Sequence, residues 1–214
     1  FREENIRRTI VFFGSARIAA KEEVTAEINA INREIAAQPN LETELLKRLK
    51  ASEHRLIMSN YYEEATDTAE LLTEWSRALP SEDRAIICTG GRPGIMQAAN
   101  RGAMRAGGKS IGFNISSPCE QGLNPYVSPK LSFESHYFFM RKLWFVHLAE
   151  ALVIFRGGFG ALDELMEILS LVQTGKLQKK IPIVAYGTAY WSGIINFDAM
   201  VKWGTKSQLD VDLF

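Results

Sequence analysis

The stretch that decides the fold reads Val153-Ile154-Phe155-Arg156-Gly157-Gly158-Phe159-Gly160-Ala161-Leu162-Asp163-Glu164-Leu165-Met166-Glu167. The apolar run from Ala151 to Phe155 predicts a buried strand, and the glycines after it allow a sharp turn close to a ligand. Apolar residues then recur at helical spacing, with Asp163 and Glu164 expected in the first helical turn. A strand, a glycine loop and a helix N-terminus form a natural anion site. The alternative is a tight turn in which both acids merely complement the helix dipole.

The composition is that of a folded protein without a charge surplus. Of the 214 residues, 46% are hydrophobic, and 25 Lys or Arg balance 25 Asp or Glu. This length predicts one domain that can bury a core without disulfides or a metal. Nucleic acids and anionic membranes attract basic surfaces, so the zero net charge argues against both as partners.

The cysteines and the hydropathy indicate the compartment. Cys88 and Cys119 lie in unrelated contexts without metal-ligand spacing, which favours a reducing environment. We recognise no signal peptide and no apolar run long enough to span a bilayer, so we expect a soluble, cytoplasmic protein. The chain begins at Phe1 without a methionine, which leaves open what precedes it.

Apolar runs alternate with helical periodicities along the chain. Strands are predicted at 9–13, 84–88, 109–115, 151–155 and 181–186, and helices at roughly 20–37, 41–50, 61–79, 95–106, 133–149, 162–174 and 191–203. This alternation predicts an α/β fold with a parallel sheet covered by helices on both faces. We expect a single nucleotide-binding domain over residues 1–214, with a charged helical insert at about 19–59. Residues 116–130 contain three prolines and are predicted to form a loop, a candidate lid.

Three loops that follow predicted strands carry chemistry suited to an anion. They are Gly14-Ser15-Ala16-Arg17, Thr89 to Gly94, and Arg156 to Gly160. Ligands of parallel sheets lie beyond the carboxyl ends of the strands, where the strand order reverses. Three such loops at one edge favour a nucleotide-like ligand, although Arg17 taken alone can equally be a solvated side chain.

Familiar nucleotide and metal motifs are absent. No loop combines G-x-G-x-x-G with an acidic residue about 20 positions on, which disfavours a nicotinamide cofactor. The pattern G-x-x-x-x-G-K-[ST] is missing as well, which disfavours a nucleoside triphosphatase. His54, His136 and His147 are scattered and form no metal signature.

Three segments together resemble the motifs of one known family. The segment from Gly90 to Met96, followed by residues 98–103, is similar to GGGxxGxM; the segment from His136 to Lys142 is similar to one that ends in Arg-Lys; and the segment from Arg156 to Glu164 resembles PGGxGTxxE. Their order and spacing are similar to those of the Lonely Guy (LOG) family, whose members were long mislabelled as lysine decarboxylases. The resemblance runs from Ile10 to Trp203, outside the insert at 19–59.

The resemblance implies both a fold and an activity. It implies a Rossmann-like, doubly wound sheet, a homodimer or higher homo-oligomer, and no metal or organic cofactor. Members are phosphoribohydrolases that cleave the N-glycosidic bond of AMP or of cytokinin riboside monophosphates, releasing the base and ribose 5-phosphate. A protein that binds a nucleoside monophosphate without turnover is the alternative, and a purely structural homologue is a third hypothesis. The preferred base is left open.

The resemblance also assigns residues. By position, Arg141 and Glu164 match the catalytic pair. A carboxylate near the anomeric carbon stabilises positive charge on the sugar and orients water, while an arginine holds a phosphate or a carboxylate. The other candidate substrate-binding residues are Gly14, Ser15, Arg17, Gly90, Gly91, Gly94, Met96, Lys142, Gly157, Gly158, Phe159, Gly160 and Ala161.

Three positions depart from the family pattern. Arg92 replaces the third glycine of GGG, Arg156 the proline of PGGxGT, and Ala161 its threonine. Ala161 removes a hydroxyl that can donate to phosphate, and Arg156 is either a replacement donor or a side chain that points away towards a surface carboxylate. We expect a functional monophosphate site with reduced or redirected hydrolase activity.

Overall fold

The computed structural model describes residues 1, 3–37, 42–116, 122–177, 179 and 181–212. Its centre is a six-stranded sheet with the order β4-β3-β2-β1-β5-β6, in which every pairing is parallel. The strands are β1 (Arg8–Phe13), β2 (Ala85–Thr89), β3 (Ser110–Ile115), β4 (Ser132–Ser135), β5 (Ala149–Ile154) and β6 (Ile183–Ala185). The predicted α/β fold is therefore confirmed.

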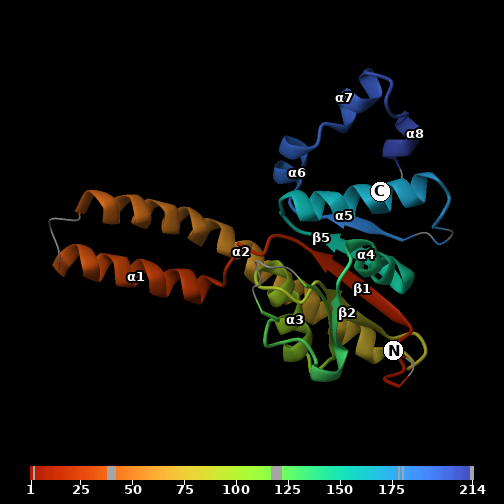
Figure 1. The fold of residues 1–214 in the computed structure, drawn as a ribbon, viewed down its shortest axis with the longest axis horizontal. Coiled ribbons are helices and arrows are strands. Elements are labelled where there is room, and N and C mark those ends of the chain that lie inside the picture. The colour runs from red at the N-terminus through yellow and green to blue at the C-terminus, as the bar shows by residue number, and fades with distance from the viewer. Residues whose placement is uncertain (2, 38–41, 117–121, 178, 180, 213–214) are drawn as a thin grey trace.

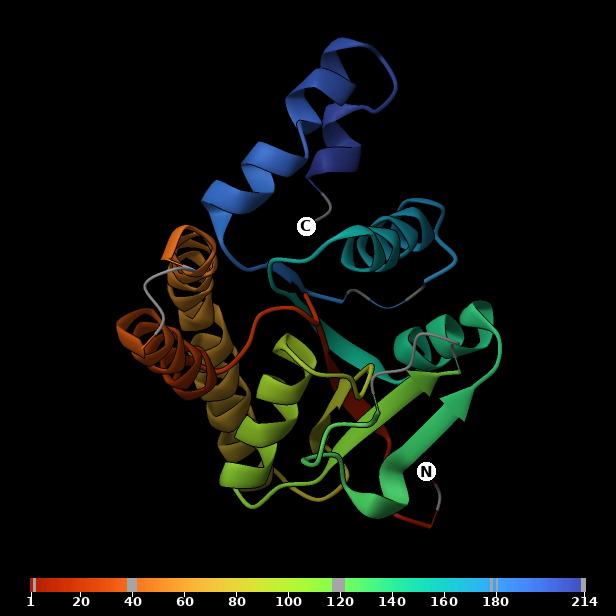
Figure 2. The same ribbon diagram turned by 60° about the vertical axis from the view of Figure 1, so that its left-hand side comes forward.

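Helices cover both faces of this sheet (Figure 2). They are α1 (Lys21–Ala37), α2 (Glu42–Ala78), α3 (Ile95–Arg105), α4 (Phe138–His147) and α5 (Phe159–Gln173), followed by three short C-terminal helices. Successive side chains of a strand point to opposite faces, so β1 feeds two cores. Val11 and Phe13 pack in the core that contains α4 and α5, while Ile10 and Phe12 pack in the core that contains α2 and α3. Burial on both faces explains why residues 10–13 of β1 are all apolar.

The strand order reverses between β1 and β5. From β1 the chain builds β2, β3 and β4 in one direction, and then returns to place β5 and β6 on the other side. Phe13 pairs with Ile154, and the amide of Phe155 donates to the carbonyl of Phe13 at 2.9 Å. The loops after these two strands consequently leave the sheet side by side, at the switch point where ligands of such sheets bind.

The helix α2 is longer than predicted. It is a single helix of 37 residues, where the sequence predicted separate helices at 41–50 and 61–79. No glycine or proline occurs between Glu42 and Ala78, so nothing in the local sequence breaks the helix. Its C-terminal half buries Tyr62, Ala65 and Ala69 in the core.

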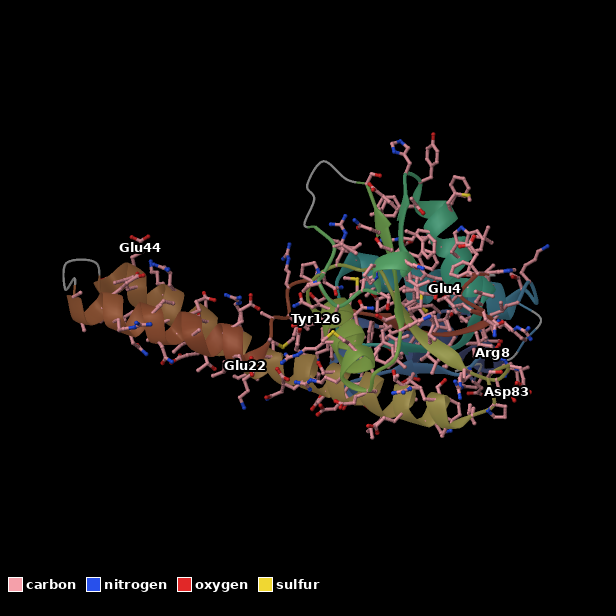
Figure 3. The ribbon with its side chains drawn as sticks, turned by 90° about the horizontal axis from the view of Figure 1, so that it is seen from below. Glu4, Arg8, Glu22, Glu44, Asp83 and Tyr126 are labelled. Atoms are coloured by element: carbon pink, nitrogen blue, oxygen red, sulfur yellow. The ribbon has the colours of Figure 1, made fainter. Side chains whose placement is uncertain are left out.

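The N-terminal half of α2 pairs with α1 in a hairpin that projects from the sheet (Figure 1). Glu22 lies near the base of this hairpin and Glu44 towards its tip (Figure 3). An ion pair of 2.5 Å between Arg55 and Glu27 joins the two arms. Residues 38–41, which include the predicted break at Pro39-Asn40, lie outside the described residues.

Residues 133–149 do not form the single helix that the sequence predicted. Ser132–Ser135 form β4, which pairs with β3, and the ring of Phe133 lies 5.4 Å from that of Phe113. Pairing with a distant strand therefore overrides the local helical pattern. In α4 the buried side chain is Phe145, whereas Phe139 and Leu143, which the helical spacing of residues 133–149 predicts to face inward, are 65% and 58% exposed.

The predicted helix at 191–203 is two helices, α6 (Thr188–Ile194) and α7 (Phe197–Lys202), and α8 (Gln208–Val211) follows them. Ile195 is extended, and the side chain of Asn196 accepts from the amide of Ala199 at 2.8 Å as the N-cap of α7. This cap restarts the helix after the break. No helix in the described part of the chain is long and apolar enough to cross a membrane.

Candidate active site at the carboxyl edge of the sheet

The three loops predicted to converge are in direct contact. The amide of Ser15 donates to the carbonyl of Arg156 at 2.9 Å, and the amide of Ile95 donates to the carbonyl of Ser15 at 3.1 Å. Gly94 has a φ of +77°, and a methyl group there would collide with the Ser15 carbonyl. A methyl group on Gly157 would collide with the side chain of Ala161. The loops pack so closely that these two positions require glycine.

Two helix N-termini open onto this edge. The helix α3 begins after Gly94 and α5 begins after Gly158, and neither N-cap donates or accepts a capping side-chain bond. Neither helix carries an acidic residue in its first turn. The prediction that Asp163 and Glu164 occupy that turn is wrong, because α5 already begins at Phe159. Both helices therefore direct a positive dipole end towards this edge without a first-turn acid to neutralise it, although the first amide of α3, that of Ile95, already donates to Ser15.

The structure brings together Arg141 of α4 and Glu164 of α5. The Nη2 atom of Arg141 lies 3.1 Å from Oε1 of Glu164, and their side chains are only 14% and 7% exposed. The guanidinium also lies over the ring of Phe138, 5.3 Å from its centroid. A Cβ atom at Gly90 would lie 3.9 Å from Nη1 of Arg141, so the loop after β2 borders the pair.

Burial controls the titration of this pair. Loss of hydration raises the pKa of Glu164 to about 7, against the opposing influence of Arg141 and Lys142. Burial also lowers the pKa of Arg141, which the charge of Glu164 partly offsets. The Nε atom of Arg141 is buried without a hydrogen-bond partner among the described residues. A carboxyl group with a pKa near 7 can both accept and release a proton at neutral pH.

Lys142 is engaged by carboxylates. Its Nζ atom lies 2.8 Å from Asp163 and 2.6 Å from Glu167, and its side chain is 15% exposed. Because these acids flank Glu164 on α5, the lysine ties α4 to α5 on either side of the buried pair. The side chain predicted to bind substrate therefore has partners within the protein.

The remaining predicted residues lie around the same edge in different environments. Arg17 is exposed, Phe159 is 93% exposed, and a methyl group on Gly160 would meet open space. The sulfur of Met96 borders Gly90, and Ala161 is buried at 7% exposure. Gly14 packs against Ile95, and Gly91 has a φ of +69°. The loop after β5 thus presents Phe159 and Gly160 to the outside and keeps Ala161 within the fold.

A buried amide network, which the sequence did not indicate, holds the loop after β2. The hydroxyl of Thr89 donates to Oδ1 of Asn100 at 2.8 Å and accepts from the amide of Gly91 at 2.9 Å. Asn124 donates through Nδ2 to the same Oδ1 at 3.0 Å and through its amide to the carbonyl of Gly91 at 2.8 Å. Asn124 lies in the predicted loop at 116–130, of which residues 117–121 are outside the described residues. An asparagine in a loop is too common for its sequence to reveal this role.

Two of the departures from the family pattern have defined surroundings. Nη2 of Arg92 donates to the carbonyl of Ile115 at 2.9 Å, and the Arg92 charge contributes to the lowered pKa of Arg141. The guanidinium carbon of Arg156 lies 3.8 Å from the ring centroid of Tyr61 in α2. Within the described part of the chain Arg156 makes no ion pair, so the surface carboxylate expected as an alternative partner is not found there.

Residues 96–214, more than half of the chain, match the model of the family described as possible lysine decarboxylase. This label is the one long given to the family whose motifs the sequence carries. The chain belongs to the Lonely Guy family. The match includes Arg141, Lys142 and the whole of the central stretch, so the buried pair lies in the part of the chain that carries the LOG assignment.

Solved structures and curated proteins were also compared with this LOG-family chain. It is 20% identical to a molybdenum cofactor binding protein from Rippkaea orientalis, over 65% of this chain and 76% of that one, with a TM-score of 0.47. It is 22% identical to the molybdenum cofactor carrier protein from Chlamydomonas reinhardtii, over 64% of this chain and 76% of that one, with a TM-score of 0.42. The comparison with curated proteins gave no significant match.

Proposed function

We propose that this LOG-family protein hydrolyses the N-glycosidic bond of a nucleoside 5′-monophosphate, AMP or a cytokinin riboside monophosphate, to the free base and ribose 5-phosphate. The observation that carries the proposal is the buried pair of Arg141 and Glu164 beside the N-terminus of α5. A carboxyl group with a pKa of about 7 and an anion-binding helix end are the two functions that this reaction needs.

The proposed roles follow from the chemistry of the bond. The amides of the loop at 156–160 and the dipole of α5 bind the 5′-phosphate, which places the ribose next to Glu164. As the C1′–N bond lengthens, positive charge develops on the sugar, and the Glu164 carboxylate stabilises it. Glu164 takes a proton from water, the hydroxide oxygen bonds to C1′, and the electron pair of the broken bond leaves with the base, which is then protonated. Arg141 keeps the carboxylate oriented through its hydrogen bond of 3.1 Å.

The alanine at position 161 sets the expected strength of binding. It supplies no hydroxyl to a phosphate, and it is buried at 7% exposure. A hydrogen bond to a charged group contributes roughly 1.5–3 kcal/mol, so we expect weaker phosphate binding than a threonine would support. Reduced or redirected turnover is the consequence we propose.

The test is release of free base from AMP and from a panel of other nucleoside 5′-monophosphates, followed by chromatography. Glu164→Gln should abolish release, whereas Glu150→Gln should not, because Glu150 is exposed and pairs only at 3.9 Å with Lys179. Binding of AMP without base release would favour the non-catalytic alternative, a protein that only binds the monophosphate. Absence of both binding and release would leave only a structural homologue.

We also propose a homodimer, as the family resemblance implies. Tyr137, Phe138, Phe139 and Leu143, at the start of α4 and along it, are all at least 58% exposed. Clustered exposed apolar side chains mark contact surfaces, and a chain with no net charge does not repel its own copies. Sedimentation should show a dimer that Phe139→Glu dissociates. A monomeric wild type would rule this proposal out.

A further inference from the structure

Arg156 lies between the glycine loop and the long helix α2. Its guanidinium carbon is 3.8 Å from the ring centroid of Tyr61, and Nη1 is 3.7 Å from the sulfur of Met58 on the same helix. On the other side the ring centroid of Tyr190, in α6, is 5.6 Å away. The guanidinium thus contacts side chains of α2 and α6, two helices that do not adjoin β5 in the sequence.

The backbone around Arg156 is held as well. Its carbonyl accepts from the amide of Ser15 at 2.9 Å, and the next carbonyl, that of Gly157, accepts from the Tyr190 hydroxyl at 2.6 Å. Gly187 lies beside the side chain, since a Cβ atom there would make an ordinary van der Waals contact of 3.4 Å with Nε of Arg156. Contacts from three directions therefore define the path of the chain as it enters the glycine loop.

We propose that Arg156 is a positioning residue for the anion-binding loop. The stacking of its guanidinium on Tyr61 holds the entry to Gly157 and Gly158, a task that a proline performs in the PGGxGT pattern by restricting its own φ. Arginine suits this role because its guanidinium is planar, stacks on aromatic faces and stays charged at all relevant pH values. The contact also makes the position of α2, and with it the base of the projecting hairpin, part of the site.

One observation favours this positioning role, called the clamp below, over a direct phosphate ligand. The guanidinium already occupies the face of the Tyr61 ring. To bind a phosphate, the Arg156 side chain would have to lose its contact with the Tyr61 ring. The expected change in KM for AMP rests on the proposed function. The expected change in hydrogen exchange does not, because it is measured without a ligand.

The experiment measures hydrogen exchange of the amides of Ser15 and Leu162 in the unliganded protein, because these amides donate to the carbonyls of Arg156 and Gly158 at 2.9 and 3.1 Å. Tyr61→Leu and Arg156→Met should each speed this exchange about tenfold, the factor that a desolvated cation–π contact supplies. The double variant should be no faster than either single one, because both remove the same contact. Tyr61→Phe keeps the ring, and Ile57→Ala changes an exposed residue of the same helix, so both should match the wild type.

Kinetics with AMP provide the second measurement. The two single variants should raise KM about tenfold and change kcat by less than about threefold, since they loosen the loop and leave Glu164 in place. Unchanged exchange of the Ser15 and Leu162 amides in both single variants would overturn the proposal, whatever their kinetics with AMP. So would weakened AMP binding in Arg156→Met but not in Tyr61→Leu, because that result identifies a phosphate ligand.

The proposal can still be tested if the wild type is inactive or if Tyr61→Leu does not fold. If the wild type releases no base from AMP, the proposed function fails, and the exchange measurement still decides the clamp. If Tyr61→Leu does not fold, Arg156→Met decides alone, because it removes both the charge and the planar group. The clamp predicts about tenfold faster exchange in the unliganded Arg156→Met protein, whereas wild-type exchange there refutes it.

Discussion

Replacing Glu164 by glutamine removes the ionisable group of the buried pair while keeping the side chain's size. Glu164 is 5% exposed, and its burial raises its pKa from an ordinary 4.5 to about 7. Between these two values the folded protein holds a proton that the unfolded chain has lost. The free energy of unfolding of the wild type therefore falls as the pH rises from about 4.5 to about 7, and this contribution is absent at higher pH.

The size of this loss follows from the shift in the Glu164 pKa. The shift lowers the free energy of unfolding of the wild type by an amount on the order of 3 kcal/mol between pH 4 and pH 8. Glutamine does not titrate, so Glu164→Gln lacks this loss. The free energy of unfolding of the variant minus that of the wild type should therefore rise by the same amount between pH 4 and pH 8. A difference that does not depend on pH is added to this, because Arg141 loses its charged partner in the variant. The wild type thus sacrifices stability at neutral pH to keep a functional carboxyl group buried.

Urea denaturation of both proteins at one-unit steps from pH 4 to pH 8 measures the difference, with the fluorescence of the four tryptophans as the signal. All other titrating groups occur in both proteins and cancel. Base release from AMP should rise through about pH 7 in the wild type, as the carboxylate forms, and be lost in the variant at every pH. Parallel stability curves would show that the Glu164 pKa is ordinary, and near-normal turnover of the variant would refute its catalytic role.

Three further predictions concern the anion site. AMP should bind at least about tenfold more tightly than adenosine in calorimetry, because charge-assisted bonds to phosphate contribute roughly 1.5–3 kcal/mol each; equal affinities would exclude a phosphate site. Gly160→Ala lies in α5 facing open space, so it should raise the free energy of unfolding by about 0.5–1 kcal/mol yet weaken AMP binding if the ligand approaches the loop closely; unchanged binding would place the phosphate elsewhere. Gly94→Ala should lower the free energy of unfolding by at least about 1 kcal/mol in urea denaturation, because it combines a φ of +77° with a collision against Ser15; a neutral effect would contradict the close packing of the loops.

Local patterns were sufficient for much of the fold and for the identity of the candidate residues. The apolar runs at residues 10–13 of β1 and 151–154 of β5 specify buried strands, because both faces of the sheet are covered there and neither run contains a polar residue. Gly94 marks a place where backbone approaches backbone, and Gly157 one where the backbone approaches the side chain of Ala161, so the residue type itself signals both close approaches. The family resemblance assigned Arg141 and Glu164 by position, and the structure places them 3.1 Å apart.

Contacts between distant parts of the chain decided the rest. Ser132–Ser135 became a strand because the edge of β3 offered unpaired backbone groups, and the inward face of α4 was set by the core that holds Phe145. The charge state of Glu164 depends on its burial and on Arg141 of α4, and the orientation of Arg156 depends on Tyr61, 95 positions earlier in the numbering. Sequence by itself determined which residues stand at the carboxyl edge of the sheet. Only the tertiary structure determined their partners, because pKa and side-chain direction are set by neighbours that the linear order separates.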